Sequence, residues 1–394
     1  IMKKQRIFLA FLALAALVSC SKEPQVENVI YLIGDGMGLG SISSLVLSED
    51  GATGFEMGDP VIGFSETCSA NNYVTDSPAG GTALATGTRT KNGYLGVDPD
   101  GNQLKSIMKD AQEMGMKSAI VVNTVLTEAT PASFYGGVLS RSQGYDLAKQ
   151  FTTSGVDVAI GSGLSVFINR PDSVDLTETL INDGYDVYLD WRSVVNTTSD
   201  KFVGILPMGD VHRRNKSTNT TAGAADGAEV CLAAKLAASA QEENIKEGYL
   251  SEPDQYLCKA TAKAIETLER ISDKGFFLMI ESAIIDGYGH NNDSVGMIEE
   301  MKEFNQTLKL LVEYVNANPN TLLVVVADHE TGGANVTYKS YEVGGTSPVV
   351  LSFSTKGHTG TLVPIFAYGA GSDNFSGIMK NTDVAVKLRT LITE

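Results

Sequence analysis

The chain has 394 residues and a formal net charge of −17 at pH 7. This charge excludes a general nucleic-acid binder, which needs a basic surface, but it does not exclude an anionic substrate, because surface charges beyond about 8 Å are screened and a local group of cations can dominate a site. The cysteines include no Cys-x-x-Cys pair, which argues against a zinc site built from thiolates.

Residues 1–19 are predicted to be a lipoprotein signal peptide. Basic residues precede an apolar run from Ile7 to Val18, which is too short to span a bilayer but fits the hydrophobic region of a signal peptide. The run ends in Leu17-Val18-Ser19-Cys20, which resembles the bacterial lipobox. We therefore expect cleavage before Cys20, a lipid anchor on that residue, and a location in the cell envelope, at the outer membrane. An ordinary signal peptide followed by a chance cysteine is the alternative.

Apolar, β-rich runs alternate with helical patterns along residues 20–394. Strands that are apolar throughout are typical of a mostly parallel sheet that is covered by helices on both faces. The sequence therefore predicts a single α/β domain, doubly wound, with a mostly parallel central sheet between helix layers. The predicted strands are 28–34, 118–126, 156–160, 276–281, 321–327 and 362–368, and the predicted helices are 78–85, 104–114, 259–271 and 297–315.

Two segments depart from this alternation. Residues 208–255 combine a loop rich in Asn, Thr, Ala and Gly with a helical stretch, and we expect an insertion that caps the main sheet. Residues 335–353, rich in Thr, Tyr, Val and Gly, are predicted to form a β-hairpin arm. An oxidising envelope would permit a disulfide between Cys231 and Cys258, although the sequence does not determine that pairing.

Carboxylates follow several of the predicted strands. Asp35, Glu281 and Asp328 each come directly after an apolar run, and ligands of open α/β sheets bind beyond the carboxyl ends of the strands. A single acid at such a position is usually a helix cap or a loop residue. Buried together, these carboxylates would need a partner charge or a metal.

The four histidines favour the metal. Asp286 and His290 are separated by one helical turn, so both lie on the same face of a helix. His329 directly follows one of the strand-end acids, and His358 lies in a Gly-His-Thr-Gly loop. Imidazole nitrogens and carboxylate oxygens are suitable zinc ligands. His212 has no such neighbours and is interpreted as an ordinary core or surface residue.

A serine marks the start of one predicted helix. We expect Ser77 at the N-cap and Pro78 at the first helical position, and capping alone would explain the serine. A helix N-terminus also attracts phosphate, and a serine hydroxyl next to a zinc cluster can act as a nucleophile. The local pattern leaves both interpretations open.

Six short motifs contain these residues and lie in order along the chain. They are Gly-Asp-Gly-Met-Gly (34–38), Thr-Asp-Ser-Pro-Ala-Gly-Gly-Thr-Ala (75–83), Glu-Ala-Thr-Pro-Ala (128–132), Glu-Ser-Ala-Ile-Ile-Asp-x-x-x-His (281–290), Ala-Asp-His-Glu-Thr-Gly-Gly (327–333) and Gly-His-Thr-Gly (357–360). Together they resemble the motifs of the alkaline phosphatase family, in the family's order and over nearly the whole of residues 20–394. The resemblance implies hydrolysis of phosphate monoesters to an alcohol and inorganic phosphate, through a phosphoserine intermediate on a site with two Zn²⁺ and one Mg²⁺.

The resemblance also implies a role for each matching residue. Ser77 is the nucleophile, Arg141 grips the substrate phosphate, and Asp76 orients Arg141. The metal ligands it implies are Asp286, His290 and His358 for the first zinc, Asp35, Asp328 and His329 for the second zinc, which also takes the Ser77 oxygen, and Asp35, Thr130 and Glu281 for magnesium.

Two positions depart from the better-known family members. Glu128 stands where those members carry Asp or His near the magnesium, and Gly287 stands where a larger residue often contacts phosphate. The sequence leaves open whether Glu128 binds magnesium directly or through water, and how fast the product leaves.

Alternative functions come from the same superfamily and from outside it. A phosphodiesterase, a sulfatase or a phosphomutase would share the metal cluster, but Arg141 and the serine nucleophile favour monoesters, and no Cys-x-Pro-x-Arg sulfatase motif occurs. A non-catalytic lipoprotein would bind zinc or phosphate without turnover. The expected partners are small phosphate monoesters; the sequence does not determine the natural substrate or the oligomeric state, for which a homodimer is one expectation.

Overall fold

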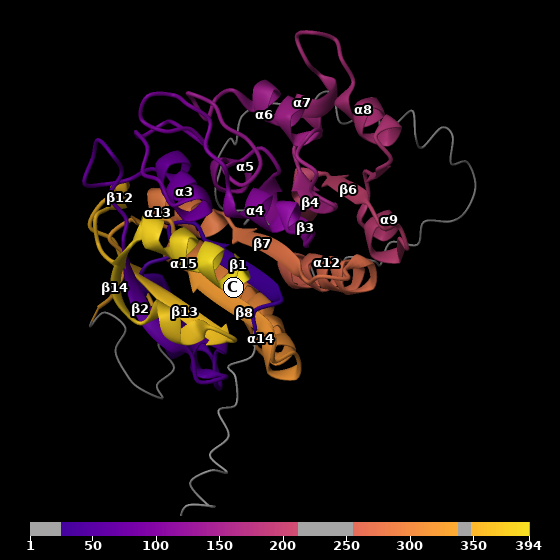
Figure 1. Ribbon diagram of the computed structural model, residues 1–394. Helices are drawn as coiled ribbons and strands as arrows, with labels where there is room; N and C mark the ends of the chain where they lie inside the picture. The colour runs from indigo at the N-terminus through magenta and orange to yellow at the C-terminus, as the bar shows by residue number, and fades with distance from the viewer. Residues whose placement is uncertain (1–24, 212–254, 338–347, 394) are drawn as a thin grey trace, which may run out of the picture.

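The computed structural model describes residues 25–211, 255–337 and 348–393, and the chain folds around one twisted sheet (Figure 1). The sheet has ten strands, and β13 alone runs antiparallel to its neighbours. Their order across the sheet is β14 (Gly377–Lys380), β2 (Val61–Glu66), β13 (Val363–Gly369), β8 (Thr321–Val326), β1 (Asn28–Gly34), β7 (Phe276–Ser282), β3 (Lys117–Val125), β4 (Val158–Ser162), β6 (Phe202–Leu206) and β5 (Asp186–Tyr188).

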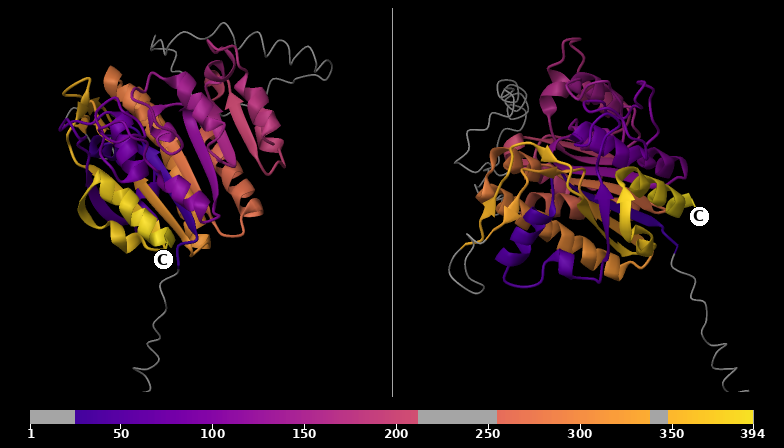
Figure 2. Two further views of the ribbon diagram at one scale, coloured as in Figure 1. Left: turned by 45° about the horizontal axis from the view of Figure 1, so that its top comes forward. Right: turned by 90° about the vertical axis from the view of Figure 1, so that its left-hand side faces the viewer.

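Helices cover both faces of this sheet (Figure 2). One face carries α2 (Leu39–Ser48), α9 (Trp191–Asn196), α12 (Tyr256–Ile271), α13 (Ile284–Asn291) and α14 (Ser294–Ala317). The other carries α3 (Ser77–Thr86), α4 (Ile107–Glu113), α6 (Gly144–Phe151), α7 (Leu164–Ile168), α8 (Leu176–Asn182) and α15 (Asn381–Thr393). Short helices α5 (Ala129–Ala132) and α10 (Met208–Val211), with 3₁₀ turns Gly54–Glu56 and Ser372–Phe375, complete the described helices.

The apolar strands divide their side chains between two hydrophobic cores. In β1, Ile30 and Leu32 pack into the core beneath α12 and α14, whereas Val29, Tyr31 and Ile33 pack into the core beneath α3, α4 and α15. Successive side chains of a strand point to opposite faces, so a strand that is apolar throughout must be covered on both sides. The prediction of a doubly wound, mostly parallel α/β domain is confirmed.

Each predicted strand is present within two residues of its expected bounds, and each predicted helix within three. Four strands of the main sheet were not predicted from the sequence: β2, β5, β6 and β14. β5 and β14 are short, β2 alternates buried with exposed side chains near one edge of the sheet, and the apolar run of β6 contains a glycine. The apolar pattern of such strands is short or interrupted. Pairing with neighbouring strands supplies much of their stability, so the sequence alone gives little sign of them.

Two small antiparallel ladders lie beyond the main sheet. β10 (Asn335–Val336) pairs with β11 (Leu351–Ser352), so the ends of the predicted arm pair as expected, while residues 338–347 lie outside the described part. β9 (Glu330–Thr331) pairs with β12 (His358–Thr359). This second ladder joins the strand-end acid and histidine after β8 to the Gly-His-Thr-Gly loop.

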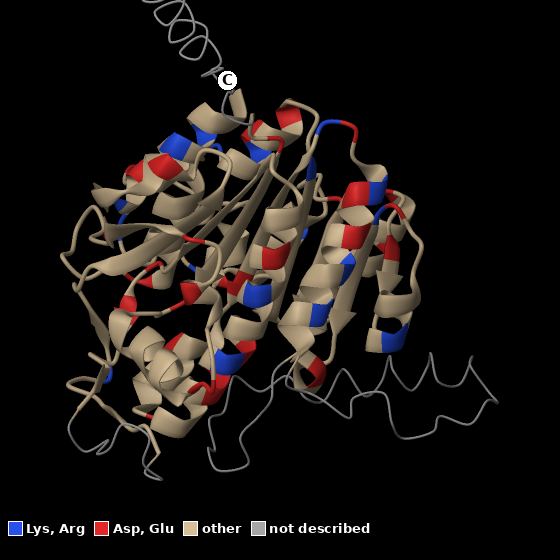
Figure 3. Cartoon of the chain, turned by 90° about the horizontal axis from the view of Figure 1, so that it is seen from below, with Lys and Arg blue, Asp and Glu red and all other residues tan. Residues whose placement is uncertain are grey.

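Several predictions concern residues that the structure does not describe. The signal peptide, Cys20, His212, Cys231 and almost all of the 208–255 insertion fall in this category, and they stay predictions. Among the described residues no helix combines the length and the apolar character needed to cross a membrane. In Figure 3, acidic and basic residues are interspersed over the helices and loops of the chain.

Candidate active site

The three strand-end acids lie side by side because their strands do. β8, β1 and β7 are adjacent and parallel, so Asp328, Asp35 and Glu281 leave the sheet at the same edge. All three side chains are buried. The structure therefore brings these predicted site residues together at the carboxyl edge of the sheet, where the strand order placed them.

Asp328 presents one carboxylate oxygen to the site and uses the other to hold itself in place. Its Oδ1 accepts hydrogen bonds from the backbone N–H groups of Gly36, at 3.2 Å, and His329, at 2.9 Å. Its Oδ2 has no hydrogen-bond partner among the described residues and lies 3.2 Å from His329 Nε2. Asp35 Oδ1, for which the described residues likewise offer no hydrogen-bond partner, lies 3.6 Å from the same nitrogen. Two carboxylate oxygens and one imidazole nitrogen thus converge on one point.

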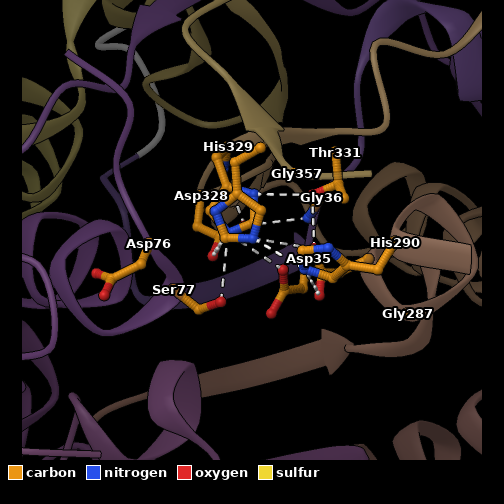
Figure 4. Close-up of polar contacts among 12 residues, drawn as sticks. Asp35, Gly36, Asp76, Ser77, Gly287, His290, Asp328, His329, Thr331 and Gly357 are labelled. Atoms are coloured by element: carbon orange, nitrogen blue, oxygen red, sulfur yellow. Dashed lines mark hydrogen bonds and ion pairs between the residues drawn. The ribbon is translucent and has the colours of Figure 1, made fainter. Parts of the chain in front are cut away.

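Ser77 reaches this point from α3. Its Oγ lies 3.3 Å from His329 Nε2 (Figure 4). The close approach depends on the glycine pair that follows the serine, because a Cβ at Gly80 would lie 3.1 Å from Asp328 and a Cβ at Gly81 would lie 3.0 Å from the Thr130 backbone. Small residues let α3 pack against the strand ends, so that the serine meets the acids and the histidine.

The predicted capping of α3 is wrong by one residue. Asp76, not Ser77, is the N-cap, and its Oδ1 accepts a hydrogen bond from Ala79 N at 3.1 Å. Ser77 is the first helical residue, and Pro78 follows it. Asp76 is extended and its side chain takes the capping bond, which leaves the Ser77 hydroxyl free to face His329. The need for an N-cap residue therefore does not explain why a serine stands at position 77.

A second group gathers around Asp286 on α13. His290 Nε2 lies 3.3 Å from Asp286 Oδ2, and His358 Nε2 lies 3.4 Å from Asp286 Oδ1. The Nδ1 atoms of both histidines face backbone carbonyls, His290 at Lys356 O (2.5 Å) and His358 at Thr75 O (2.9 Å). Each Nδ1–H can donate to its carbonyl, which leaves the Nε2 lone pair directed into the site.

The two Nε2 atoms also lie only 3.1 Å from one another. Only one of them can donate a proton to the other, so two lone pairs facing one point suit a shared cation better than a direct contact. The ligand atoms of Asp286, His290 and His358 lie within 4.8 Å of one another, as do those of Asp35, Asp286 and His329. Asp286 thus stands between both groups, whereas the sequence analysis assigned it to the first alone.

A third set of donors lies next to Asp35. Thr130 Oγ1 and both carboxylate oxygens of Glu281 are buried without a hydrogen-bond partner in the described part of the chain. Buried polar atoms are almost always paired, and hard oxygen donors of this kind are those that magnesium prefers. The donors that the resemblance assigned to two zinc ions and one magnesium ion therefore fit those cations.

The buried acids repel one another. Burial raises the pKa of Asp35 well above its usual range, and the nearby charges of Asp328, Asp286 and Glu281 raise it further. Burial and the charge of Asp286 raise the pKa of Asp328 to about 7. Burial and the charges of Glu128 and Asp328 raise the pKa of Glu281, while the charge of Arg141 acts in the other direction. Bound cations would reverse these shifts, because they favour the charged carboxylates.

The histidines divide into two kinds. Burial, aided by the charge of His358, lowers the pKa of His329 to about 3, so this ring is neutral and offers a lone pair near pH 7. The hydrogen bond to Asp286 raises the pKa of His290 to about 9. Burial would raise the pKa of Asp286, but its hydrogen bonds to His290 and His358 outweigh burial and lower it well below the usual range. A cation that binds at His290 must therefore displace a proton.

Arg141 contacts a different acid from the one expected. Its Nη2 pairs with Glu128 Oε1. The Asp76 carboxylate instead points away from the histidines (Figure 4) and accepts a hydrogen bond from Gly93 N at 2.6 Å. Gly93 O in turn accepts one from Arg141 N, at 3.2 Å. The connection between Asp76 and Arg141 therefore runs through the backbone of Gly93.

A buried hydrogen-bond network that was not predicted from the sequence lies behind the site. Glu300 Oε1, on α14, accepts hydrogen bonds from Asn123 Nδ2 at 2.6 Å and from Ser282 Oγ at 2.7 Å. Asn123 Oδ1 accepts one from Ala283 N at 2.8 Å. This network supports the turn between Glu281 and the start of α13. The available signal was a polar residue, Asn123, directly after the apolar run of β3.

Comparisons with known proteins agree with this geometry. The family model described as alkaline phosphatase matches residues 26–352. Alkaline phosphatase 4 of Bacillus subtilis (strain 168) is 27% identical to this chain, over 92% of this chain and 87% of the relative. The alkaline phosphatase of Escherichia coli (strain K12) is 28% identical, over 96% of this chain and 88% of the relative. The structure of alkaline phosphatase from the Antarctic bacterium TAB5 is 30% identical, covers 94% of this chain and 99% of that one, and superposes with a TM-score of 0.77. A variant of that protein, with a glutamate in place of one histidine, has magnesium bound in its M3 site.

Proposed function

This chain belongs to the alkaline phosphatase family, and we propose that it hydrolyses phosphate monoesters through a phosphoserine intermediate on Ser77. As a member of that family it is a phosphatase, and its substrates are phosphate esters. The serine intermediate, the metal complement and the residue roles are the proposal. The observation that carries it is the Ser77 hydroxyl, 3.3 Å from His329 Nε2 at the point where buried acids converge.

Three groups of residues would hold the cations. Asp286, His290 and His358 would hold one zinc, Asp35, Asp328 and His329 a second, and Asp35, Thr130 and Glu281 a magnesium ion. When bound, the cations supply positive charge and Lewis acidity, which neutralise the substrate phosphate and lower the pKa of the serine hydroxyl.

The chain's own groups then carry the phosphoryl transfer. Ser77 Oγ forms a bond to phosphorus as the bond to the ester oxygen breaks, and the alcohol leaves with one proton. Water then adds to the phosphoserine, which releases inorganic phosphate and restores the Ser77 hydroxyl. The position of Ser77 at the first turn of α3 adds the partial positive charge of a helix N-terminus to the phosphate site.

Glu128 and Gly287 are the two positions that depart from the better-known family members. Glu128 pairs with Arg141 and its charge also acts on Glu281, so it connects the magnesium donors to the residue proposed to grip phosphate. A Cβ at Gly287 would meet only Ile284 Cγ2, at 3.9 Å, so this position is open within the described residues. We propose that Arg141 grips the substrate phosphate and that residue 287, a glycine, adds no side-chain contact to it.

The substrate class can be tested with three compounds that share one leaving group. We expect kcat/KM on 4-nitrophenyl phosphate to exceed that on bis(4-nitrophenyl) phosphate and on 4-nitrophenyl sulfate by at least ~100-fold, because a site built for two charged non-bridging oxygens leaves groups unpaired when one is missing. Faster hydrolysis of the diester or the sulfate would contradict the monoesterase proposal. Tight zinc binding without turnover of any of the three compounds would identify a binding protein.

Arg141→Lys tests the phosphate grip. Arginine can bind two phosphate oxygens at once, whereas lysine offers a single point charge, so we expect KM for the monoester and Ki for inorganic phosphate to rise together, by roughly 10-fold to 100-fold. The matched control is Arg192→Lys, at an exposed position on α9, which should change neither constant. Unchanged phosphate inhibition in Arg141→Lys would remove Arg141 from the substrate site.

A further inference from the structure

Thr331 lies at the junction of the two zinc-type groups. It belongs to β9, where it pairs directly with His358 of β12, and its side chain is fully buried. It is also two residues from His329 and close to Asp286. In the sequence, Thr331 stands inside the Ala-Asp-His-Glu-Thr-Gly-Gly motif, where the resemblance implies no role for it.

One hydroxyl serves both groups. Thr331 Oγ1 lies 2.5 Å from Asp286 Oδ1. It also lies 3.2 Å from His329 Nδ1, and both Thr331 and His329 are labelled in Figure 4. A threonine hydroxyl has one proton to donate, and a carboxylate can only accept. The Thr331 proton therefore goes to Asp286, and the Thr331 oxygen accepts a hydrogen bond from the Nδ1–H of His329.

This arrangement selects one tautomer of His329. With the proton on Nδ1, the Nε2 lone pair faces Ser77 Oγ, Asp35 Oδ1 and Asp328 Oδ2. The other tautomer would place an N–H group at the point where those oxygens converge, and a protonated nitrogen cannot bind a metal. The same hydroxyl holds the Asp286 carboxylate in the orientation that faces His290 and His358.

The surrounding backbone holds the threonine side chain in this position. Gly36 has a φ of +73°, and a Cβ on it would lie 2.8 Å from Thr331 Oγ1. A Cβ on Gly289 would lie 2.8 Å from the Thr331 methyl group, Cγ2. The Thr331 side chain is thus packed closely on its hydroxyl side and on its methyl side. This packing favours the rotamer that makes both hydrogen bonds.

We propose that Thr331 is a positioning residue that joins the two zinc sites: it holds Asp286 for one and selects the metal-binding tautomer of His329 for the other. The proposal rests on the proposed function, because it concerns the same cations. It adds that removing one hydroxyl group weakens both sites together, although Thr331 itself binds neither metal.

The test compares Thr331→Val with Thr331→Ser in the full chain. Valine keeps the shape and removes the hydroxyl, whereas serine keeps the hydroxyl and removes the methyl group. We expect Thr331→Val to bind Zn²⁺ about 10-fold to 100-fold more weakly in chelator competition, and Thr331→Ser to recover most of that loss. The control is Thr267→Val on α12, which removes an equally buried hydroxyl that donates to Lys263 O and should leave zinc affinity unchanged.

A second measurement reads the tautomer without any turnover. In the metal-free protein, ¹⁵N NMR of the imidazole rings should show His329 protonated on Nδ1 in the wild type, with Nε2 protonation appearing in Thr331→Val. A wild-type His329 that is protonated on Nε2, or a Thr331→Val protein with wild-type zinc affinity, overturns the proposal. If zinc affinity falls in Thr331→Val while the wild type hydrolyses no monoester, the proposed function fails and the role of Thr331 stands.

Discussion

Ser77→Ala is expected to reduce turnover of 4-nitrophenyl phosphate by roughly 10³-fold or more. The alanine keeps the start of α3, because Asp76 and not Ser77 provides the cap, so the fold and the cation donors remain. What is lost is the oxygen that forms the bond to phosphorus. Any remaining activity would come from water at the same position, with charge stabilisation by the rest of the site.

Chemical trapping makes this prediction specific. Brief incubation with ³²P-labelled substrate, followed by acid quench, should label the wild-type chain on Ser77 and leave Ser77→Ala unlabelled. Ser165→Ala is a matched control, since Ser165 is a partly exposed serine near the start of another helix, α7, and it should retain both turnover and labelling. A wild-type rate in Ser77→Ala would exclude Ser77 as the nucleophile.

Removal of the cations is expected to abolish activity entirely. Dialysis against a chelator should reduce monoester turnover to background, and Zn²⁺ with Mg²⁺ should restore it where either ion alone restores only part, because the donors form nitrogen-rich and oxygen-only groups. Metal content per chain, measured by plasma mass spectrometry on the active sample, checks the proposed two zinc ions and one magnesium ion. Full activity in a chain freed of metal would contradict the proposal.

The metal-free chain should also become less stable as the pH rises from about 6.5 to 9. The pKa of His290 is raised to about 9, and the pKa of Asp328 is raised to about 7. In this window the folded state holds protons that the unfolded state has released, so the free energy of unfolding falls with increasing pH. His329, with its pKa lowered to about 3, acts in the opposite direction, but only below about pH 6.5, the pKa of an ordinary histidine.

Thermal denaturation measured across this pH range tests the effect. The midpoint of the metal-free chain should fall by several degrees between pH 6.5 and 9, and reloading with Zn²⁺ and Mg²⁺ should remove most of the dependence, because cations neutralise the same carboxylates. A metal-free chain whose midpoint rises with pH would mean that the buried acids and histidines are not clustered as described.

The local patterns of the sequence were sufficient to predict the central sheet and the edge of the sheet at which the site lies. Apolar runs such as 28–34 and 321–327 predicted strands that are buried on both faces, and the acids that follow them predicted a site at one edge of the sheet. These inferences worked because hydrophobic periodicity and strand-end position are local properties that burial of apolar surface turns directly into structure. Short edge strands such as β14 carried no comparable pattern.

Local sequence patterns could not predict which side chains contact one another within the site. Asp76 was expected to orient Arg141, yet it caps α3 and binds Gly93 N, while Glu128 pairs with Arg141. Such contacts depend on how separate loops pack against one another, and several acids compete for each donor. Sequence distance carries little information about the outcome.

By itself, then, the amino-acid sequence determined the class of fold, the identity of the acids and histidines, and the family they resemble, since residue type and order along the chain are sufficient for each of these. Only the tertiary structure decided that the Ser77 hydroxyl faces His329, that Asp286 stands between two groups of donors, and that Thr331 joins them. Those facts rest on distances between atoms contributed by α3, α13, β9 and β12, and the packing of these elements around the sheet fixes those distances.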